Sequence, residues 1–306
     1  MDKLSTIEGS SVMLIRDNLL EKKPLISFEI FPPKKDYPID TIYKTIDELY
    51  NLYPDFISVT YGAGGSTKDN TVEIASYIKE KYNLSALAHL TCVTSSKQEI
   101  EEILESLKAR GVNNIMALRG DYPPQYKIED YPQAYKSAVD LIKHIKQTGD
   151  FCVGAACYPE GHPDAVSTEE EMLYLKSKVD AGADFLVSQL FFDNDVFYNF
   201  MEQVRKYSID IPVFAGIMPV LNKNQIERMV SLTGCKFPQK FLRILDKYKD
   251  SPEALREAGL AYATEQIIDL LSWGIDGIHL YTMNKPDATK EIIDRITTIR
   301  GVLTHT

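Results

Sequence analysis

One carboxylate in this sequence stands where burial would be costly. Glu29 interrupts the apolar run LISFEIF at residues 25–31. Moving an ionised carboxyl group out of water costs free energy unless a cation or hydrogen bonds compensate, so we expect Glu29 to be either paired or functional. A partner cation elsewhere in the fold is the structural alternative. Burial raises the pKa of a carboxyl group, which would suit Glu29 for general-acid catalysis near neutral pH.

Polar residues also stand at the ends of several later apolar runs. They are Thr60 ahead of the glycine-rich segment 62–65, His89, Arg119 with Gly120 and Asp121, Tyr158 with His162, and Gln189. A buried glutamine offers both a donor and an acceptor, which suits the edge of a heterocycle. Taken singly, each feature has a plain structural explanation, such as a turn, a satisfied core histidine or a salt bridge. Their recurrence at the same end of successive runs favours one shared site.

Eight short apolar runs, rich in β-branched and aromatic residues, alternate with helical patterns. The runs cover residues 25–31, 56–62, 85–92, 114–120, 151–158, 185–192, 213–220 and 277–283. Near-continuous apolar sequence is typical of parallel strands covered on both faces, and one strand and one helix in ~30 residues is the βαβ pattern. We therefore expect an α/β fold, a (β/α)8 barrel of the TIM type, with reactive groups at the carboxyl ends of its strands. An open doubly wound sheet is the competing fold, but no GxGxxG motif follows the first run.

The same patterns predict helices and domain limits. Apolar spacing indicates helices at 40–52, 97–109 and 168–182, and the long interval 232–275 indicates extra helices before the last strand. The sequence has no Gly-, Pro- or Ser-rich linker. We expect residues 1–306 to form a single catalytic domain, with residues 1–22 as an N-terminal helical extension.

Composition excludes several classes of function. The net charge is −10, with 44 acidic against 34 basic residues, which argues against a nucleic-acid partner. The four cysteines lack CxxC spacing, so we expect reduced, buried packing residues. The N-terminal segment lacks the apolar region of a signal peptide, and no run approaches the ~20 apolar residues of a membrane span, so a cytoplasmic protein is expected. Neither metal-ligand spacing nor a GxSxG hydrolase motif is present.

Motifs spread along the chain resemble those of the bacterial methylenetetrahydrofolate reductases. They are SFEIFPPK, SVTYGAGGST, AHLTC, ALRGDYPP, AACYPEGHP, KVDAGADFLVSQLFFD, GIMPV and HLYTMNK, in order from about residue 25 to residue 300. The resemblance implies an FAD-dependent oxidoreductase of one-carbon metabolism and methionine biosynthesis. NADH or NADPH would reduce the flavin and leave, and 5,10-methylenetetrahydrofolate would then bind the same face and be reduced to 5-methyltetrahydrofolate.

The resemblance also implies roles for individual residues. Glu29 becomes the general acid that protonates the folate at N10, and Asp121 tunes the flavin and stabilises developing positive charge. The residues implied in FAD binding are Thr60, His89, Arg119, Gly120, Asp121, Lys136, Tyr158, His162, Ala165, Glu171 and Lys178. Gln189, Gln225 and Lys285 would bind folate, and the two glutamines and Tyr158 would also meet the nicotinamide.

Some positions depart from the family pattern. Ser177 stands where relatives often carry an arginine, and Tyr174, Glu171, Lys136 and Lys285 stand in place of asparagine, aspartate, alanine and arginine. The exchange at Lys285 replaces a bidentate fork by a point charge. The changes affect the phosphate contacts of FAD, which Lys136 and Lys178 partly restore, and leave the reaction centre intact.

The resemblance leaves two alternatives and implies some partners. One alternative is an electron-accepting flavoprotein subunit of a larger complex, which would not oxidise NADH or NADPH when isolated. The other is a barrel flavoenzyme acting on a different substrate, such as proline, which suits the two glutamines less well. Relatives form dimers or tetramers, so a homo-oligomer is expected. The chain ends near residue 306, so we expect no eukaryotic-type regulatory domain and no adenosylmethionine feedback.

Overall fold

A closed barrel of parallel strands forms the centre of the computed structural model, which describes residues 14–33, 37–61, 68–122, 132, 134–226, 229 and 234–303. The strands are β1 (Leu25–Ile30), β2 (Phe56–Val59), β3 (Ser85–Thr91), β4 (Asn114–Leu118), β5 (Cys152–Cys157), β6 (Phe185–Ser188), β7 (Val213–Ile217) and β8 (Gly277–Tyr281). Each strand pairs in parallel with its neighbour in the sequence, and β8 closes on β1. The predicted (β/α)8 barrel is confirmed, and the doubly wound alternative is wrong.

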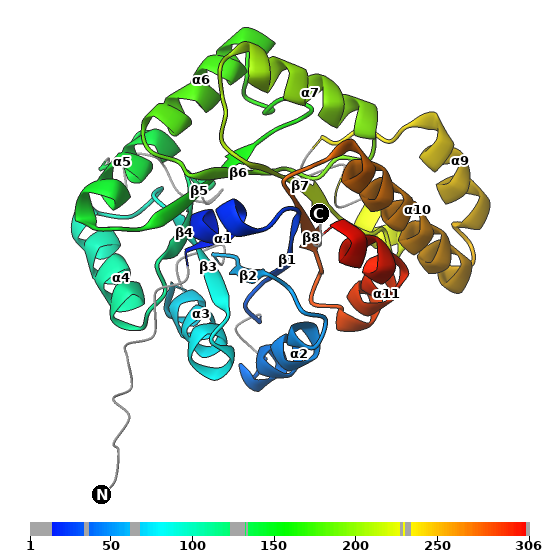
Figure 1. Cartoon of the computed structure of the whole chain (residues 1–306), viewed down its shortest axis with the longest axis horizontal. Helices are drawn as coiled ribbons and strands as arrows, with labels where there is room; N and C mark the ends of the chain where they lie inside the picture. Colours follow the sequence, from blue (N-terminus) through cyan, green and yellow to red (C-terminus); the bar gives the residue numbers. More distant parts are fainter. Residues whose placement is uncertain are drawn as a thin grey trace, which may run out of the picture.

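Helices surround the barrel, and the first of them lies across its end rather than beside it (Figure 1). They are α1 (Ile15–Glu21), α2 (Asp40–Tyr50), α3 (Lys68–Tyr82), α4 (Lys97–Ala109), α5 (Ala138–Thr148), α6 (Thr168–Asp180), α7 (Asn194–Lys206), α9 (Gln239–Tyr248), α10 (Pro252–Trp273) and α11 (Pro286–Leu303). Local sequence fixes several starts: Ser96 and Glu99 form a capping box on α4, and the Ser167 hydroxyl accepts the Glu170 N–H on α6. The extra helices predicted within 232–275 are α9 and α10.

Each of the eight strands ends before the last residue of the apolar run that predicted it. The run 185–192 is the clearest case, because β6 stops at Ser188. Leu190 and Phe192 leave the sheet and pack instead in a separate apolar cluster with residues of α9 and α10, such as Phe241 and Tyr262. The polar residues that follow the strands therefore lie in the loops at the carboxyl end of the barrel, where a TIM-type barrel places its chemistry.

Helix α1 closes the opposite end of the barrel. The Ile15 N–H donates to Oδ1 of Asn114, at the first residue of β4, over 2.8 Å. Leu14, Ile15 and Leu19 pack against apolar residues at the amino ends of the strands, including Phe56. The predicted N-terminal helical extension thus contains α1 from residue 15; residues 1–13 lie outside the described part of the chain.

All four cysteines are buried and free, as the sequence predicted, and burial raises the pKa of Cys92 to about 11 and the pKa values of Cys152 and Cys157 to about 12. Within the described residues, no helix has the length and apolar character needed to cross a membrane.

Candidate active site

A cavity of about 270 Å³ opens at the carboxyl ends of the strands, and we call it the mouth. Its apolar lining comes from Leu87, Met116, Leu118, Ala156 and Val187, and its polar lining from Glu29, Thr60, His89, Tyr158, Ser188, Gln189, His279 and Tyr281. The predicted residues Glu29, Thr60, His89, Tyr158 and Gln189 are therefore together in one cavity. A flat apolar surface edged by polar groups is the usual lining of a site for a planar ring.

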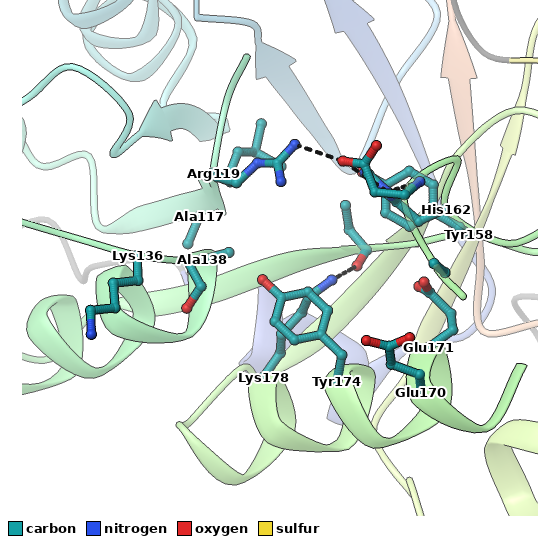
Figure 2. Close-up of a pocket in the computed structure, with 15 residues that line it drawn as sticks. Ala117, Arg119, Lys136, Ala138, Tyr158, His162, Glu170, Glu171, Tyr174 and Lys178 are labelled. Carbon is teal, nitrogen blue, oxygen red and sulfur yellow. Dashed lines mark hydrogen bonds and ion pairs between the residues drawn. The ribbon is translucent and has the colours of Figure 1, made fainter. Parts of the chain in front are cut away.

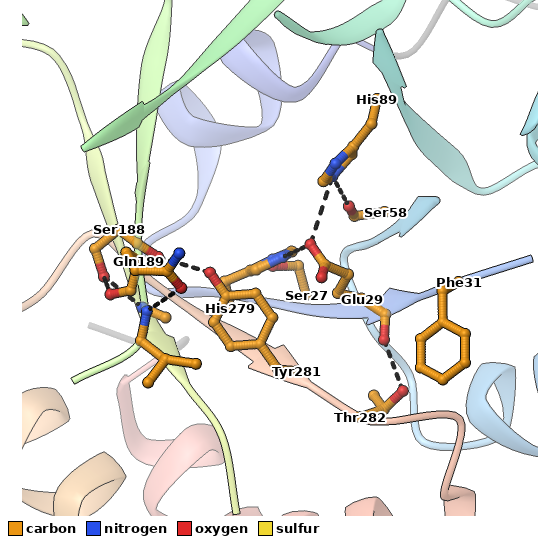
Figure 3. Close-up of polar contacts among 12 residues, drawn as sticks. Ser27, Glu29, Phe31, Ser58, His89, Ser188, Gln189, His279, Tyr281 and Thr282 are labelled. Carbon is orange, nitrogen blue, oxygen red and sulfur yellow. Dashed lines mark hydrogen bonds and ion pairs between the residues drawn. The ribbon is translucent and has the colours of Figure 1, made fainter. Parts of the chain in front are cut away.

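Glu29 points into the barrel from β1, and its side chain is 18% exposed. Its main chain is held by β8 and the following turn, because the Thr282 hydroxyl donates to the Glu29 carbonyl oxygen over 2.6 Å. Its carboxylate lies between two histidines (Figure 3): Oε2 is 3.2 Å from Nε2 of His279 and 3.5 Å from Nε2 of His89. The carboxyl group is thus at the mouth and has polar partners on either side.

Each of these histidines is held by a buried serine. Nδ1 of His279 is 2.7 Å from the hydroxyl of Ser27, and Nε2 of His89 is 2.7 Å from the hydroxyl of Ser58. Strand register explains the first pair, because Ser27 and His279 are direct partners across β1 and β8. Five side chains from β1, β2, β3 and β8 therefore form one polar network across the interior of the barrel.

The network changes the electrostatics that the sequence suggested for Glu29. Burial acts to raise the pKa of the Glu29 carboxyl group, but the hydrogen bond from His279 and the electrostatic effect of the two histidines outweigh it, so the pKa lies below its usual range. The predicted rise is therefore wrong for this arrangement. Burial also lowers the pKa of His89 to about 4, which keeps that ring neutral at pH 7. His279 is then the ring that holds the carboxylate directly.

A second cavity, of about 280 Å³, adjoins the mouth and lies between β4, β5, α5 and α6; we call it the outer cavity (Figure 2). It shares Leu118, Ala156 and Tyr158 with the mouth. The predicted cofactor residues that line it are Arg119, Lys136, Tyr158, His162, Ala165, Glu171 and Lys178. The two cavities are joined at these shared residues, and the outer one is lined by three cations, Arg119, Lys136 and Lys178, together with the carboxylates of Asp164, Glu170 and Glu171.

Lys178 is the most buried cation of the outer cavity. Its Nζ donates to the Ala156 carbonyl oxygen over 2.9 Å and lies 4.6 Å from the ring centroid of Tyr174. Burial lowers the pKa of Lys178, and the charge of Glu171 opposes that effect. Arg119 reaches Asp164 over 3.4 Å from a more exposed position. An incoming anion would therefore meet one buried and one exposed cation.

Three of the five departures from the family pattern, Lys136, Glu171 and Tyr174, line this cavity. Tyr174 lines it, Lys136 lies exposed at its rim, and Ser177 uses its hydroxyl to donate to the Tyr174 carbonyl oxygen over 2.6 Å. Ser177 is not among the lining residues. Lys136 and Lys178, which were expected to restore the phosphate contacts in part, both line the cavity, and that role stays a prediction.

Four predicted residues line neither cavity: Gly120, Asp121, Gln225 and Lys285. Gly120 has φ +81°, and a Cβ there would lie 2.8 Å from Val93, so a backbone requirement accounts for it. Asp121 is exposed directly after it.

The carboxamide of Gln225 closes the loop after β7, accepting from the Leu221 N–H and donating to the Pro219 carbonyl oxygen, each over 2.9 Å. Lys285 stands just before α11, where its N–H donates to the Thr282 carbonyl oxygen over 2.9 Å. The ligand contacts expected of Gln225 and Lys285, and those of Gly120 and Asp121, stay predictions.

Sequence reasoning missed the contribution of β8. His279 and Tyr281 both line the mouth, although the run 277–283 suggested only a strand. Their spacing of two residues was the available signal, because alternate residues of a strand share a face. Ser27, two residues before Glu29, follows the same rule. Within the described residues, no group of three or more His, Cys, Asp and Glu side chains is placed to hold a metal ion.

Comparison with known proteins decides the family. A family model described as methylenetetrahydrofolate reductase matches residues 14–297. The chain belongs to the methylenetetrahydrofolate reductase family. Relatives within this family include methylenetetrahydrofolate reductase (NADH) 1 of Arabidopsis thaliana, which is 38% identical over 84% of this chain and 46% of the relative. The 5,10-methylenetetrahydrofolate reductase of Escherichia coli is 35% identical over 87% of this chain and 88% of the relative.

The chain spans about half the length of the plant relatives that it matches and most of the length of the bacterial ones. A solved structure from Clostridium thermocellum, described as an uncharacterized protein that binds two copies of 5-methyl-5,6,7,8-tetrahydrofolic acid, superposes with a TM-score of 0.68. The match covers 95% of this chain and all of that chain at 16% identity, so it shows a shared fold. Membership of a reductase family agrees with the enzyme that the sequence motifs predicted.

Proposed function

We propose that this chain reduces 5,10-methylenetetrahydrofolate to 5-methyltetrahydrofolate, using FAD and a reduced nicotinamide nucleotide, NADH or NADPH. The observation that carries the proposal is the place of Glu29: a carboxyl group at the mouth, beside an apolar surface and within 3.2 Å of His279. Family membership supports the reaction class, and the position of this carboxyl group supports it as the proton carrier where a ring-shaped substrate would bind.

The residues present fit FAD. Its isoalloxazine ring needs an apolar surface with polar edges, which the mouth offers through Leu118 and Ala156, the apolar lining residues that are only partly buried. Its diphosphate needs cations and N–H donors, and the outer cavity offers Arg119 and Lys178. Because Tyr158 lines both cavities, one extended ligand can occupy them together. Hydride transfer is the chemistry that FAD would supply here.

The task of the protein is to hold the folate and to move one proton. Reduction of the bridging carbon breaks its bond to N10 and adds a hydride to the carbon, so N10 must gain a proton. Glu29 is the group placed to give it. A ring seated over the mouth removes the remaining exposure of this side chain, and further desolvation raises the pKa of the carboxyl group toward the range of a general acid. Nε2 of His279 lies within reach as a second site for the same proton.

Gln189 supplies the recognition of the ring in this proposal. It follows directly after β6 and lines the mouth together with Glu29. A carboxamide can pair with the polar edge of a nicotinamide or of a pterin, so the same residue can serve two ligands that bind in turn. Ping-pong transfer through the flavin follows from this shared position.

An anaerobic titration tests the proposal. FAD-loaded protein should bleach when NADH or NADPH is added and recover its oxidised absorbance when methylenetetrahydrofolate follows. Glu29→Gln should keep the first step and lose roughly 10²-fold or more in the rate of the second, which is the usual contribution of a general acid. Glu101→Gln, an exposed change on α4, is the matched control.

The outcomes are separable. Folate reduction at the parent rate in Glu29→Gln would refute the acid role. FAD-loaded parent protein that neither nicotinamide nucleotide reduces would refute direct use of NADH or NADPH and favour electron supply by a partner protein.

A further inference from the structure

Tyr281 lies in the mouth between Glu29 and Gln189, and the proposed reaction gives it no task. It is the last residue of β8, and its ring meets the His279 ring edge-on, with centroids 5.3 Å apart. Its hydroxyl turns toward β6 and donates to the main-chain carbonyl oxygen of Ser188 over 2.7 Å (Figure 3). Burial raises the pKa of Tyr281 well above its ordinary value, so the hydroxyl stays protonated and remains a donor.

Ser188 is the residue through which Tyr281 reaches Gln189. Ser188 ends β6 and is fully buried. Its hydroxyl accepts the Gly216 N–H over 2.8 Å and donates to the carbonyl oxygen of Gln189 over 3.0 Å. Tyr281 therefore holds the carbonyl group of Ser188, while the Ser188 hydroxyl holds the next carbonyl group along. The peptide units on both sides of the Gln189 α-carbon are thus held from β7 and β8, and the Gln189 N–H also donates to the Cys157 carbonyl oxygen of β5 over 2.7 Å.

The side chain of Gln189 has a defined orientation as a result. Its Oε1 accepts the N–H of Leu190 over 2.9 Å. Because an N–H donor requires the oxygen of the amide at that point, the amide nitrogen is the atom that Gln189 offers to the cavity. This side chain is therefore set to donate a hydrogen bond to an acceptor atom on a bound ring.

Gly216 leaves the space in which the Tyr281 hydroxyl lies. A Cβ built on Gly216 would be 2.9 Å from the hydroxyl oxygen of Tyr281 and 2.3 Å from the carbonyl oxygen of Ser188. Both distances are shorter than the van der Waals contacts that real Cβ atoms make. Tyr281 and Ser188 thus pack directly against Gly216 inside the barrel, in space that any larger residue at position 216 would fill.

We propose that Tyr281 is a positioning residue: its hydroxyl fixes Ser188 so that the Gln189 amide nitrogen faces the mouth and donates to an acceptor atom of the folate or nicotinamide ring. This inference rests on the proposed function and adds to it the direction of the hydrogen bond, with the protein as donor and the bound ring as acceptor. Rings that carry a carbonyl oxygen or an unprotonated ring nitrogen at that edge are selected, and rings that carry only donors there are rejected.

The experiment measures the binding of 5-methyltetrahydrofolate to the oxidised, FAD-loaded full chain. The change in the flavin absorbance reports the binding. Tyr281→Phe should weaken binding about 5- to 10-fold, the usual effect of one lost hydrogen bond. Tyr262→Phe is the matched control, because Tyr262 donates its hydroxyl to the Phe192 carbonyl oxygen over 2.6 Å and lines neither the mouth nor the outer cavity. That variant should bind within about twofold of the parent, although it loses the same kind of bond.

A double-mutant cycle separates positioning from direct contact. If Tyr281 acts through Gln189, Tyr281→Phe should change binding by less than about twofold in a Gln189→Ala background, because the group that it positions is gone. An undiminished effect in that background would overturn the inference, and so would parent-like binding by Tyr281→Phe alone. Parent protein that binds no 5-methyltetrahydrofolate would instead refute the proposed function.

Discussion

The contact between Glu29 and His279 at the mouth leads to a prediction about the pKa of Glu29, which can be measured at a single carbon atom of that side chain. His279→Phe keeps an aromatic ring at a position that is 1% exposed and removes both ring nitrogens. Glu29 then loses the hydrogen bond that, after burial, has the largest effect on its pKa. Ser27 keeps a hydrogen-bond partner, because its hydroxyl also lies 3.3 Å from the Ile278 carbonyl oxygen.

The direction and size of the change follow from the contacts. Burial acts to raise the pKa of Glu29 and is undiminished in the variant, while the opposing hydrogen bond is gone, so the pKa must rise. A hydrogen bond to a charged group contributes about 1.5–3 kcal/mol, and about 1.4 kcal/mol corresponds to one pKa unit. We therefore expect the pKa of Glu29 to rise in His279→Phe, with about the free energy of one hydrogen bond to a charged group behind the change.

The shifted pKa of Glu29 also makes the stability of the folded protein depend on pH. A depressed carboxyl pKa stabilises the folded parent above the unfolded pKa of Glu29, and this contribution is lost as the pH falls through the folded value. The pH-dependent part of the stability difference between parent and His279→Phe should therefore be present at pH 7 and vanish in acid.

Carbon-13 NMR of protein labelled at the glutamate δ-carbon measures this pKa directly, and Glu29→Gln assigns the resonance by its loss. His144→Phe is the matched control, since His144 bonds Tyr135 and Glu101 on the outside of the barrel. It should leave the Glu29 titration where it is. A Glu29 titration that stays in place or moves to lower pH in His279→Phe would refute the electrostatic reasoning.

Three further predictions concern stability and reactivity. Gly259→Ala places a Cβ 1.8 Å from the Val220 carbonyl oxygen, and should cost about 3 kcal/mol or more in urea denaturation, whereas Gly301→Ala meets nothing within 4 Å and should be neutral or slightly stabilising. Because His89 titrates near 4 in the fold and near 6.5 when unfolded, stability should fall by up to about 3 kcal/mol as the pH drops through that window, and denaturation of His89→Gln should show a flatter profile. With its pKa raised to about 12, Cys157 should resist a thiol reagent in the native protein and react after unfolding; rapid native labelling at Cys157 would contradict its burial.

The fold was accessible from the sequence because both faces of each barrel strand are buried. Such a strand appears in the sequence as a nearly continuous apolar run, so all eight strands could be located. The ends of the runs were misleading, since Leu190 and Phe192 are apolar for a different reason: they pack under α9 and α10 rather than in the sheet. An apolar run in the sequence does not show in which apolar cluster each of its residues packs.

The candidate site was accessible only in part. Glu29 was visible because a carboxylate is out of place in an apolar strand, but its pKa depends on His279, which is 250 residues away in sequence. A histidine or tyrosine inside a strand is ordinary, so His279 and Tyr281 gave no comparable signal. The sequence singled out Gln225 as a polar residue, but only the three-dimensional structure shows that its carboxamide closes a loop.

Helix α1 at the base of the barrel has a consequence for the timing of proton uptake. Between α1 and His279 the interior is filled by side chains such as Phe56, Phe185 and Phe214, which do not pass protons between buried groups. Among the described residues, the path from Glu29 to water therefore leads through the mouth. In the proposed reaction, a ring lying over the mouth would also halt proton exchange, so the carboxyl group would have to regain its proton after one ligand leaves and before the next arrives.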